Sequence, residues 1–292
     1  MPTDILQLMK PRILLLLVIT CAAGYVVATR GNPDLFQPFS FVITLLGLAL
    51  VAGGANTVNM WYDQDIDKIM QRTQSRPLPA GRMSGQTVLT LGILWQLLGT
   101  TMLALLVNVW TAAAALAGGL FYVFIYTMLL KRRTVQNIVI GGAAGAFPPV
   151  VGWAAVQNDI LHPLPWLLFT VIFLWTPPHF WALALLANKD YTNAGIPMLP
   201  VKQGVAATKI QIVFYLLLLI PFTLALGLYP PLGIFYTLAA AGLGVWWGLL
   251  AYRMCAQGTP EEVNIPLTKR MFKVSIYYLG LLFLAMVIDV WI

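Results

Sequence analysis

Nine long apolar stretches constrain the fold of this chain more than any other feature of its sequence. They cover residues 13–29, 40–60, 87–107, 110–130, 135–156, 164–187, 210–229, 232–252 and 274–291. A helix rises about 1.5 Å per residue, so each stretch is near the length that crosses a hydrocarbon core of about 30 Å. A transmembrane barrel would need shorter strands of alternating polarity. The pattern predicts an all-α, polytopic membrane protein with nine transmembrane helices.

The composition indicates a chain that lies mostly in lipid. Hydrophobic residues make up 60% of the sequence and charged residues only 9%, whereas about 25% of a soluble domain is charged. An ordinary soluble enzyme needs a polar surface and a disordered chain needs low hydrophobicity, so both classes are excluded. The two cysteines, Cys21 and Cys255, are too few for a disulfide framework, and we expect two unpaired thiols.

The basic residues indicate the orientation of the helices. Of 17 lysines and arginines, only Arg30 lies in a loop of the second side, and the others precede the first stretch or follow the second, fourth, sixth and eighth. Because basic loops stay in the cytoplasm, we expect the N-terminus and the Asp-rich loops there and the C-terminus opposite. The positive net charge is then a topology signal, and we expect no nucleic-acid partner. No transit extension precedes Lys10, which favours a bacterial cell (inner) membrane over an organelle.

A weak internal repeat suggests how the chain is organised. The second and sixth stretches each end in a cluster of Asn and Asp, and a basic loop with prolines follows each cluster. The chain has no low-complexity tract and no flexible linker. We therefore expect a single domain over residues 1–292, built from two four-helix halves plus a ninth helix, with the site between the halves.

The acidic residues are few, and they point to a metal site. Three of the ten lie in the segment Asn59-Met-Trp-Tyr-Asp63-Gln-Asp65-Ile-Asp67. On a continuous helix Asn59, Asp63 and Asp67 share one face, whereas Asp65 points nearly the other way. Their oxygens suit Mg²⁺, which often bridges to substrate phosphates. The alternative is a solvated acidic helix end, but an asparagine one turn inside an apolar stretch is costly without a role.

Basic residues complete a candidate diphosphate site beside these acids. The loop that follows contains Lys68, Arg72, Arg76 and Arg82. Arginine forms bidentate hydrogen bonds with phosphate oxygens, and as a group beside three aspartates these residues favour phosphate binding. Any single one of them serves topology equally well.

The second polar cluster, residues 188–193, has a single carboxylate. Three readings of it remain open. Asp190 and Asn193 hold a second metal ion, or Lys189 and Lys202 contact phosphate directly, or the cluster is an ordinary polar loop at a helix end.

Short motifs along the first seven stretches match a known pattern. They are Lys10-Pro-Arg12, Asn59-x3-Asp63-x3-Asp67, Arg72-Thr-x2-Arg76-Pro-Leu-Pro-Ala-Gly-Arg82, Tyr126-Thr, Lys131-Arg-x-Thr-x2-Asn137 with Gly141-Gly142, Trp175-Thr-Pro-Pro-His-Phe-Trp181-Ala-Leu-Ala, and Asp190-Tyr-x3-Gly195-Ile-Pro-Met-Leu-Pro200. With these motifs the sequence resembles the UbiA-type intramembrane prenyltransferases, and within them the haem-farnesylating branch. The string from Trp175 to Trp181 is highly specific, whereas the first aspartate motif alone indicates only the superfamily.

The resemblance implies a fold, a reaction and a set of site residues. Nine helices would surround a central cavity with the aspartate clusters at its cytoplasmic mouth. The chain would bind farnesyl diphosphate with Mg²⁺ and transfer the farnesyl group to a vinyl group of haem b, a substrate rather than a cofactor. Addition of water would give haem o. By motif position, Asn59, Asp63 and Asp67 would be metal ligands, and Arg72 and Arg76 would contact the diphosphate.

Further residues complete the candidate set. Asp190 is a further candidate metal ligand, although Ala194 stands where many superfamily members carry a second carboxylate, so the resemblance leaves the second metal site open. The other partners would be the lipid bilayer and a downstream haem A synthase or terminal oxidase assembly. The candidate substrate-binding residues are Lys131, Asn137, His179, Lys189, Asp190 and Lys202.

Two polar residues inside apolar stretches have open roles. His179 lies between Pro178 and Phe180 and should face the interior, where it ligates haem iron, holds a propionate or hydrogen-bonds a neighbouring helix. Asn137 either lines the same cavity or bonds between helices. His162, beside Pro163 in a short outer loop, is expected to be exposed.

Two other functions compete with haem farnesylation. One is prenyl transfer to an aromatic or quinone-precursor acceptor, against which the Trp175–Trp181 string argues. The other is a cation-coupled secondary transporter, which would place charged groups near the bilayer midplane, whereas these acids cluster at the predicted cytoplasmic helix ends.

Overall fold

The apolar stretches form helices throughout the computed structural model, which describes residues 2–292. Its nine membrane-length helical spans are Pro11–Thr29 (α2), Pro38–Tyr62 (α3), Gly85–Leu106 (α5), Val109–Leu130 (α6 and the π-helix η2), Asn137–Gln157 (α7 to α9), Pro163–Leu186 (α10), Leu199–Leu226 (α12), Ile234–Ala256 (α13) and Ile265–Asp289 (α14). Within residues 2–292 no strand occurs. The prediction of an all-α protein with nine spans is confirmed.

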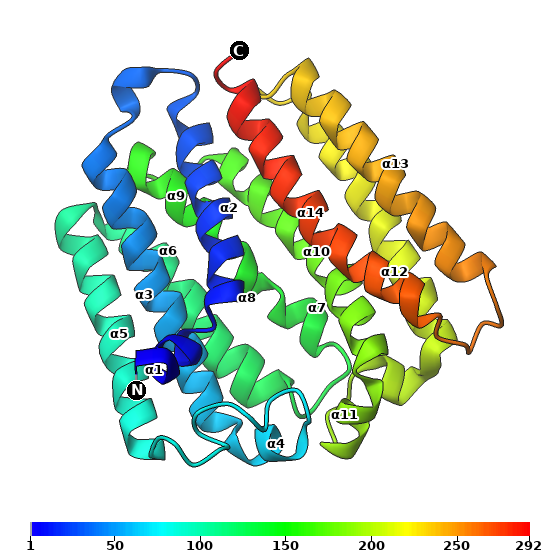
Figure 1. The fold of residues 1–292 in the computed structure, drawn as a ribbon. Coiled ribbons are helices and arrows are strands. Elements are labelled where there is room, and N and C mark those ends of the chain that lie inside the picture. The colour runs from blue at the N-terminus through cyan, green and yellow to red at the C-terminus, as the bar shows by residue number, and fades with distance from the viewer. Residues whose placement is uncertain (1) are drawn as a thin grey trace.

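Besides the 3-10 helix Pro33–Leu35 (η1), three short α-helices between residues 2 and 292 lie outside the spans, and all three carry polar residues. They are Pro2–Met9 (α1), Gln64–Ile69 (α4) and Asn188–Asn193 (α11). Together with the N-terminus they lie at one end of the helical bundle, and the C-terminus lies at the other (Figure 1). The two termini lie at opposite ends because the chain crosses the bundle an odd number of times, nine, between residues 2 and 292.

Two spans begin earlier than their apolar stretches predict. The seventh starts at Leu199 rather than at 210, and the ninth starts at Ile265 rather than at 274. The early part of α12 is separated from the rest by Gly204, whose φ of 83° is not helical. Polar residues at a membrane surface can continue a helix into water, so hydropathy marks the lipid-buried part of a helix and not its end.

The helix ends follow from side chains that satisfy free backbone groups. Ser84 accepts a hydrogen bond from Thr87 N at the start of α5, Asn108 caps α6, and Asn264 caps α14. Proline occupies the first turn of α2, α3 and α10. Both devices begin a helix where four N–H groups have no intrahelical partner.

The spans follow one another around the molecule. Helix α3 packs against α2 and α5, α6 packs against α5 and α9, and α10 packs against α12; α13 and α14 follow, and α14 packs against both α10 and α2 (Figure 1). The largest cluster of buried apolar side chains lies between α10, α12, α13 and α14. By contrast α5 is mostly uncovered, with Leu97 59% and Leu105 78% exposed, as a lipid-facing helix should be.

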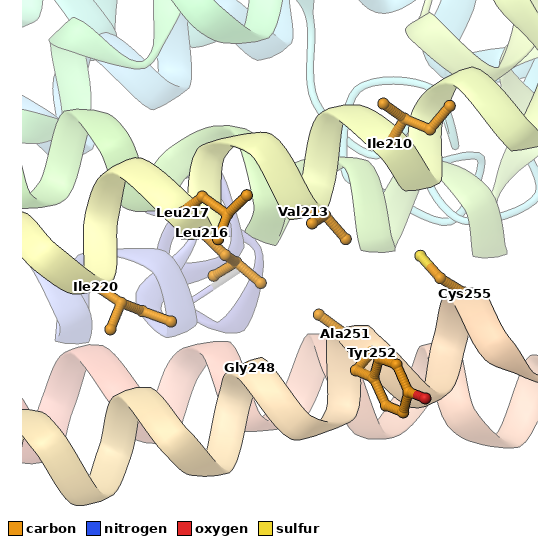
Figure 2. Close-up of a pocket in the computed structure, with 9 residues that line it drawn as sticks. All are labelled: Ile210, Val213, Leu216, Leu217, Ile220, Gly248, Ala251, Tyr252 and Cys255. Carbon is orange, nitrogen blue, oxygen red and sulfur yellow. The ribbon is translucent and has the colours of Figure 1, made fainter.

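An apolar groove of about 420 Å³ lies between α12 and α13 (Figure 2). It is lined by Ile210, Val213, Leu216, Leu217, Ile220, Gly248, Ala251, Tyr252 and Cys255. The lining contains no charged residue, so the groove is not a candidate for the chemistry. Both thiols are unpaired, as predicted; Cys255 is exposed at this groove and Cys21 is buried.

Candidate functional site

The first polar cluster forms where α3 meets α4. Helix α3 ends at Tyr62, so the helix is not continuous as the sequence suggested, and Asp63 lies at the junction. The hydrogen-bond register nevertheless continues, because Asp63 N donates to Asn59 O and Asp67 N donates to Asp63 O, each at 2.9 Å. The one-face geometry of Asn59, Asp63 and Asp67 is therefore preserved across the break.

Burial separates these residues from the remaining aspartate. The exposed fractions of Asn59, Asp63 and Asp67 are 3%, 1% and 2%, whereas the side chain of Asp65 is 60% exposed. Asn59 Nδ2 donates to Asp63 Oδ2 at 2.8 Å and to Thr127 Oγ1 at 3.1 Å. An exposed acidic helix end would show no such burial, so the alternative of a solvated cluster fails for Asp63 and Asp67.

Four cations from three parts of the chain surround these acids. Lys10 Nζ donates to Asn59 Oδ1 at 2.6 Å, and Arg76 Nη1 donates to Asp67 Oδ2 at 2.6 Å. Lys131 forms an ion pair with Asp63.

The fourth cation, Arg132, joins the buried acid to the exposed one. It lies 3.3 Å from Asp63 Oδ1 and holds both oxygens of Asp65 at 2.6 and 2.7 Å. This bidentate hydrogen bonding with Asp65 is the first cause that lowers the pKa of Asp65 and raises the pKa of Arg132.

Lys10 occupies an electrostatically unfavourable place in this group. Burial of its ammonium group lowers its pKa well below the ordinary value, and the positive charges of Arg76 and Lys131 lower the pKa further. Asp67 and Asp63 oppose the shift only in part. The site thus gathers four basic side chains, Lys10, Arg76, Lys131 and Arg132, around three aspartates, and a bound anion would stabilise the charged form of Lys10.

The second polar cluster meets the first through one arginine. Arg72 N donates to Asp190 Oδ2 at 3.3 Å, although Arg72 and Asp190 are 118 residues apart. Burial raises the pKa of the neighbouring Tyr191, and the positive charge of Arg72 opposes this shift. The hydrogen bond joins the two polar loops, but among residues 2–292 Asp190 does not form with Asp63 and Asp67 a group of acids that could hold a metal ion.

Other predicted residues lie apart from the acids. Lys189, Lys202 and Lys68 are exposed, and Arg82 binds Asp4 at 2.8 Å.

Asn137 and His179 are both buried, and each is held by a different kind of bond. Asn137 Nδ2 donates to Thr134 O at 2.6 Å within its own segment, not between helices, and its Oδ1 has no partner among residues 2–292. His179 Nδ1 lies 2.6 Å from Ser275 Oγ on α14. The interhelical hydrogen bond that the sequence left open for His179 is therefore present.

Three residues of the site belong to the sequence motifs but had no role in it predicted. Lys10 and Thr127 bind the amide of Asn59, Arg132 binds Asp63, and the hydroxyl of Tyr122 lies 3.5 Å from Lys10 Nζ. The sequence signal for Lys10 is the proline that follows it. In the structure Lys10 has a positive φ of 56°.

Thr127 and Tyr122 lie on the π-helix Phe121–Leu130, a form of helix that occurs frequently at functional sites. Here the rings of Tyr122 and Tyr126 stack at 5.4 Å. The stack places two aromatic rings next to the polar cluster.

Comparison with known proteins supplies the family. The model of the UbiA prenyltransferase family matches residues 17–286. The chain belongs to this family. As a UbiA prenyltransferase, it shares its fold with a solved digeranylgeranylglyceryl phosphate synthase, at a TM-score of 0.78 and 17% identity over 99% of this chain and 98% of that one. A UbiA homologue from Archaeoglobus fulgidus bound to DMAPP and Mg²⁺ has a TM-score of 0.70 at 15% identity, over 97% and 99% of the two chains.

Curated relatives of this UbiA prenyltransferase are much more similar in sequence. The relative from Symbiobacterium thermophilum is 48% identical over 98% of this chain and 94% of its own length. The relative from Synechocystis sp. is 49% identical over 97% of this chain and 87% of its own length. The relative from Acidiphilium cryptum is 47% identical over 98% of this chain and 90% of its own length. All three are named protoheme IX farnesyltransferase.

Proposed function

We propose that this UbiA prenyltransferase transfers the farnesyl group of farnesyl diphosphate to a vinyl group of haem b, with addition of water. The products are haem o and diphosphate. The acceptor is supported by relatives of 46–49% identity over nearly the whole chain, all named protoheme IX farnesyltransferase. The chemistry is supported by one observation above all, the buried cluster in which two carboxylates and an amide face four cations.

The donor set of this cluster fits Mg²⁺. Asn59, Asp63 and Asp67 offer hard oxygen ligands on one face. Asp190 is a further carboxylate on the neighbouring polar loop, outside the group that these three residues form. The homologue from Archaeoglobus fulgidus was solved with Mg²⁺ and a prenyl diphosphate. Bound Mg²⁺ supplies stabilisation of the negative charge that develops on the leaving diphosphate.

The cations of the site would bind the diphosphate itself. Arg76 and Lys131 form ion pairs with Asp67 and Asp63. They would therefore be close enough to contact a phosphate held at these aspartates. The backbone of Arg72 is bonded to Asp190, so its guanidinium would hold the diphosphate from the side of Asp190. Such donors stabilise charge on the leaving group as the allylic C–O bond breaks.

The apolar surroundings of the cluster would protect the carbocation. The stacked rings of Tyr122 and Tyr126 lie on the span that contributes Thr127 to the site. Aromatic faces attract cations, and a dry pocket prevents premature quenching by water. We propose that the farnesyl chain extends past these rings into a central cavity between the two four-helix halves, where haem b meets it.

Location and partners complete the proposal. A bacterial cell membrane, with the aspartate clusters on the cytoplasmic side, agrees with the basic loops lying at one end of the spans. Lys189 and Lys202 are exposed beside the second cluster, and we propose that they attract the incoming diphosphate rather than contact it in the reaction. The product would pass to a haem A synthase or an oxidase assembly.

Production of haem o in cells tests the proposed function. The chain is expressed in a bacterial host that makes haem b but not haem o, and extracted haems are analysed by mass spectrometry. Haem o should appear with the wild-type chain and be nearly absent with Asp63→Asn. Wild-type protein present in the membrane without haem o would contradict haem farnesylation. Prenylated quinone precursors in the same extracts would favour the aromatic acceptor.

A further inference from the structure

His179 is held in one orientation from three sides. The indole of Trp175 stacks on one side of the imidazole at 4.3 Å and 18°, and the ring of Phe272 stacks at 4.8 Å and 27°. Trp175 is itself fixed, because its Nε1 donates to Ser275 O at 2.7 Å. Ser275 therefore anchors Trp175 and His179, which lie one turn apart on α10, to α14.

The hydrogen bonds of Ser275 determine the tautomer of His179. Ser275 Oγ donates to Phe272 O at 2.6 Å, and a carbonyl oxygen can only accept. The single hydroxyl hydrogen of Ser275 is thereby used, so Oγ can only accept from His179 Nδ1, 2.6 Å away. Nδ1 carries the hydrogen. In a neutral imidazole Nε2 then has a free lone pair.

This lone pair is available to a ligand. The two nitrogens lie on different edges of the ring, so Nε2 points away from Ser275 and α14, and it makes no hydrogen bond to any residue between 2 and 292. The residue as a whole is 9% exposed, so His179 is not completely enclosed by protein. A histidine that binds metal has this arrangement, with the second nitrogen donating to a hydrogen-bond acceptor.

The depth of His179 matches the proposed acceptor. It lies seven residues before the end of α10 at Leu186, which is about 10 Å along the helix axis from the second polar cluster. A macrocycle centred there would extend its edge towards the diphosphate site.

We propose that His179 Nε2 is an axial ligand of the iron of the haem substrate, and that Ser275 is the positioning residue that fixes its tautomer and plane. The proposal rests on haem b being the acceptor. Ligation would hold the macrocycle by its centre while a vinyl group reaches the allylic carbon.

The sequence offers a clean spectroscopic test because it has only two histidines. Full-length protein with a histidine-free affinity tag is placed in lipid nanodiscs, loaded with haem b, and studied by optical, EPR and ferrous resonance Raman spectroscopy. Wild type and the matched control His162→Gln should show the same iron–histidine band. His179→Gln should lack this band and bind haem roughly tenfold more weakly or worse, and added imidazole should restore the band in His179→Gly.

Ser275 variants test the positioning role. They also keep the proposal testable if the His179 variants fail to fold. Ser275→Ala should keep the band at a shifted frequency, and Ser275→Thr, which retains the hydroxyl, should restore it. An unchanged band in His179→Gln, or in Ser275→Ala, would overturn the corresponding part of the proposal. Wild-type protein that makes haem o without an iron–histidine band would refute ligation alone, whereas absence of both haem binding and haem o would refute the proposed function.

Discussion

Replacing Asp63 by asparagine separates the chemical role of this carboxylate from its structural role. Asp63 is 1% exposed and accepts hydrogen bonds from Asn59, Lys131 and Arg132. Asparagine has the same shape but no charge, and it offers one acceptor oxygen instead of two. The change removes a proposed metal ligand while leaving Asn59 and Asp67 in place.

The contacts allow the magnitudes to be estimated. The partners Lys131 and Arg132 are 15% and 31% exposed; Arg132 keeps Asp65, whereas Lys131 loses its only carboxylate partner among residues 2–292 and keeps the amide oxygen. We expect a loss of about 1–3 kcal/mol in the free energy of unfolding, as for a buried charged hydrogen bond. Loss of a group that stabilises the leaving diphosphate should lower turnover about 100-fold or more, or about 2.7 kcal/mol.

Asp65→Asn is the matched control, because it makes the same chemical change two residues away. The side chain of Asp65 is 60% exposed and binds Arg132, so its loss should cost less than about 1 kcal/mol and little activity. The assay measures haem o formation by purified protein as a function of Mg²⁺, with thermal unfolding in parallel. Equal activity losses in the two variants, or near-wild-type turnover in folded Asp63→Asn, would refute the reasoning.

Three further predictions follow from other parts of the structure. Lys10→Met should lower turnover about tenfold or more because it removes the donor to Asn59 Oδ1. Arg12→Met changes an exposed residue and should leave turnover unchanged. If a kinetic assay gives Lys10→Met and Arg12→Met the same turnover, Lys10 does not belong to the site. Gly24→Ala should lower the unfolding temperature, because its Cβ would lie 2.6 Å from Pro149 Cα, at a cost of about 1–3 kcal/mol; Gly280→Ala, with open space around its Cβ, is the control, and no difference between the two would contradict close packing of α2 on α9. A membrane-impermeant maleimide should label Cys255 in inside-out vesicles only, since Cys21 is buried; labelling of intact cells would reverse the proposed orientation, and Cys255→Ser gives the background.

Much of the fold could be predicted because the lipid bilayer restricts the choices. Backbone groups in hydrocarbon must bond within the segment, so a long apolar stretch has to be a helix of a certain length. Hydropathy failed where this restriction ends, at the polar starts of the seventh and ninth spans. The break at Asp63 was also missed, because periodicity alone gives no sign of a helix that stops and restarts in register.

Part of the site could also be predicted from local sequence spacing. The common face of Asn59, Asp63 and Asp67 follows from four-residue spacing, and so does the opposite direction of Asp65. Which cations meet these acids does not follow. Arg82 and Lys68 are close in sequence but lie elsewhere, and the partners include Lys10 and Arg132 from distant segments.

The sequence by itself determined nine membrane helices, their alternation and the grouping of three oxygen ligands, because helical periodicity and the thickness of a bilayer act on neighbouring residues. Only the tertiary structure decided that Lys10 binds Asn59, that Arg72 meets Asp190, and that Ser275 hydrogen-bonds His179 from 96 residues away. These pairs depend on how helices pack against one another, and packing is set by side-chain shape along whole interfaces rather than by any local pattern.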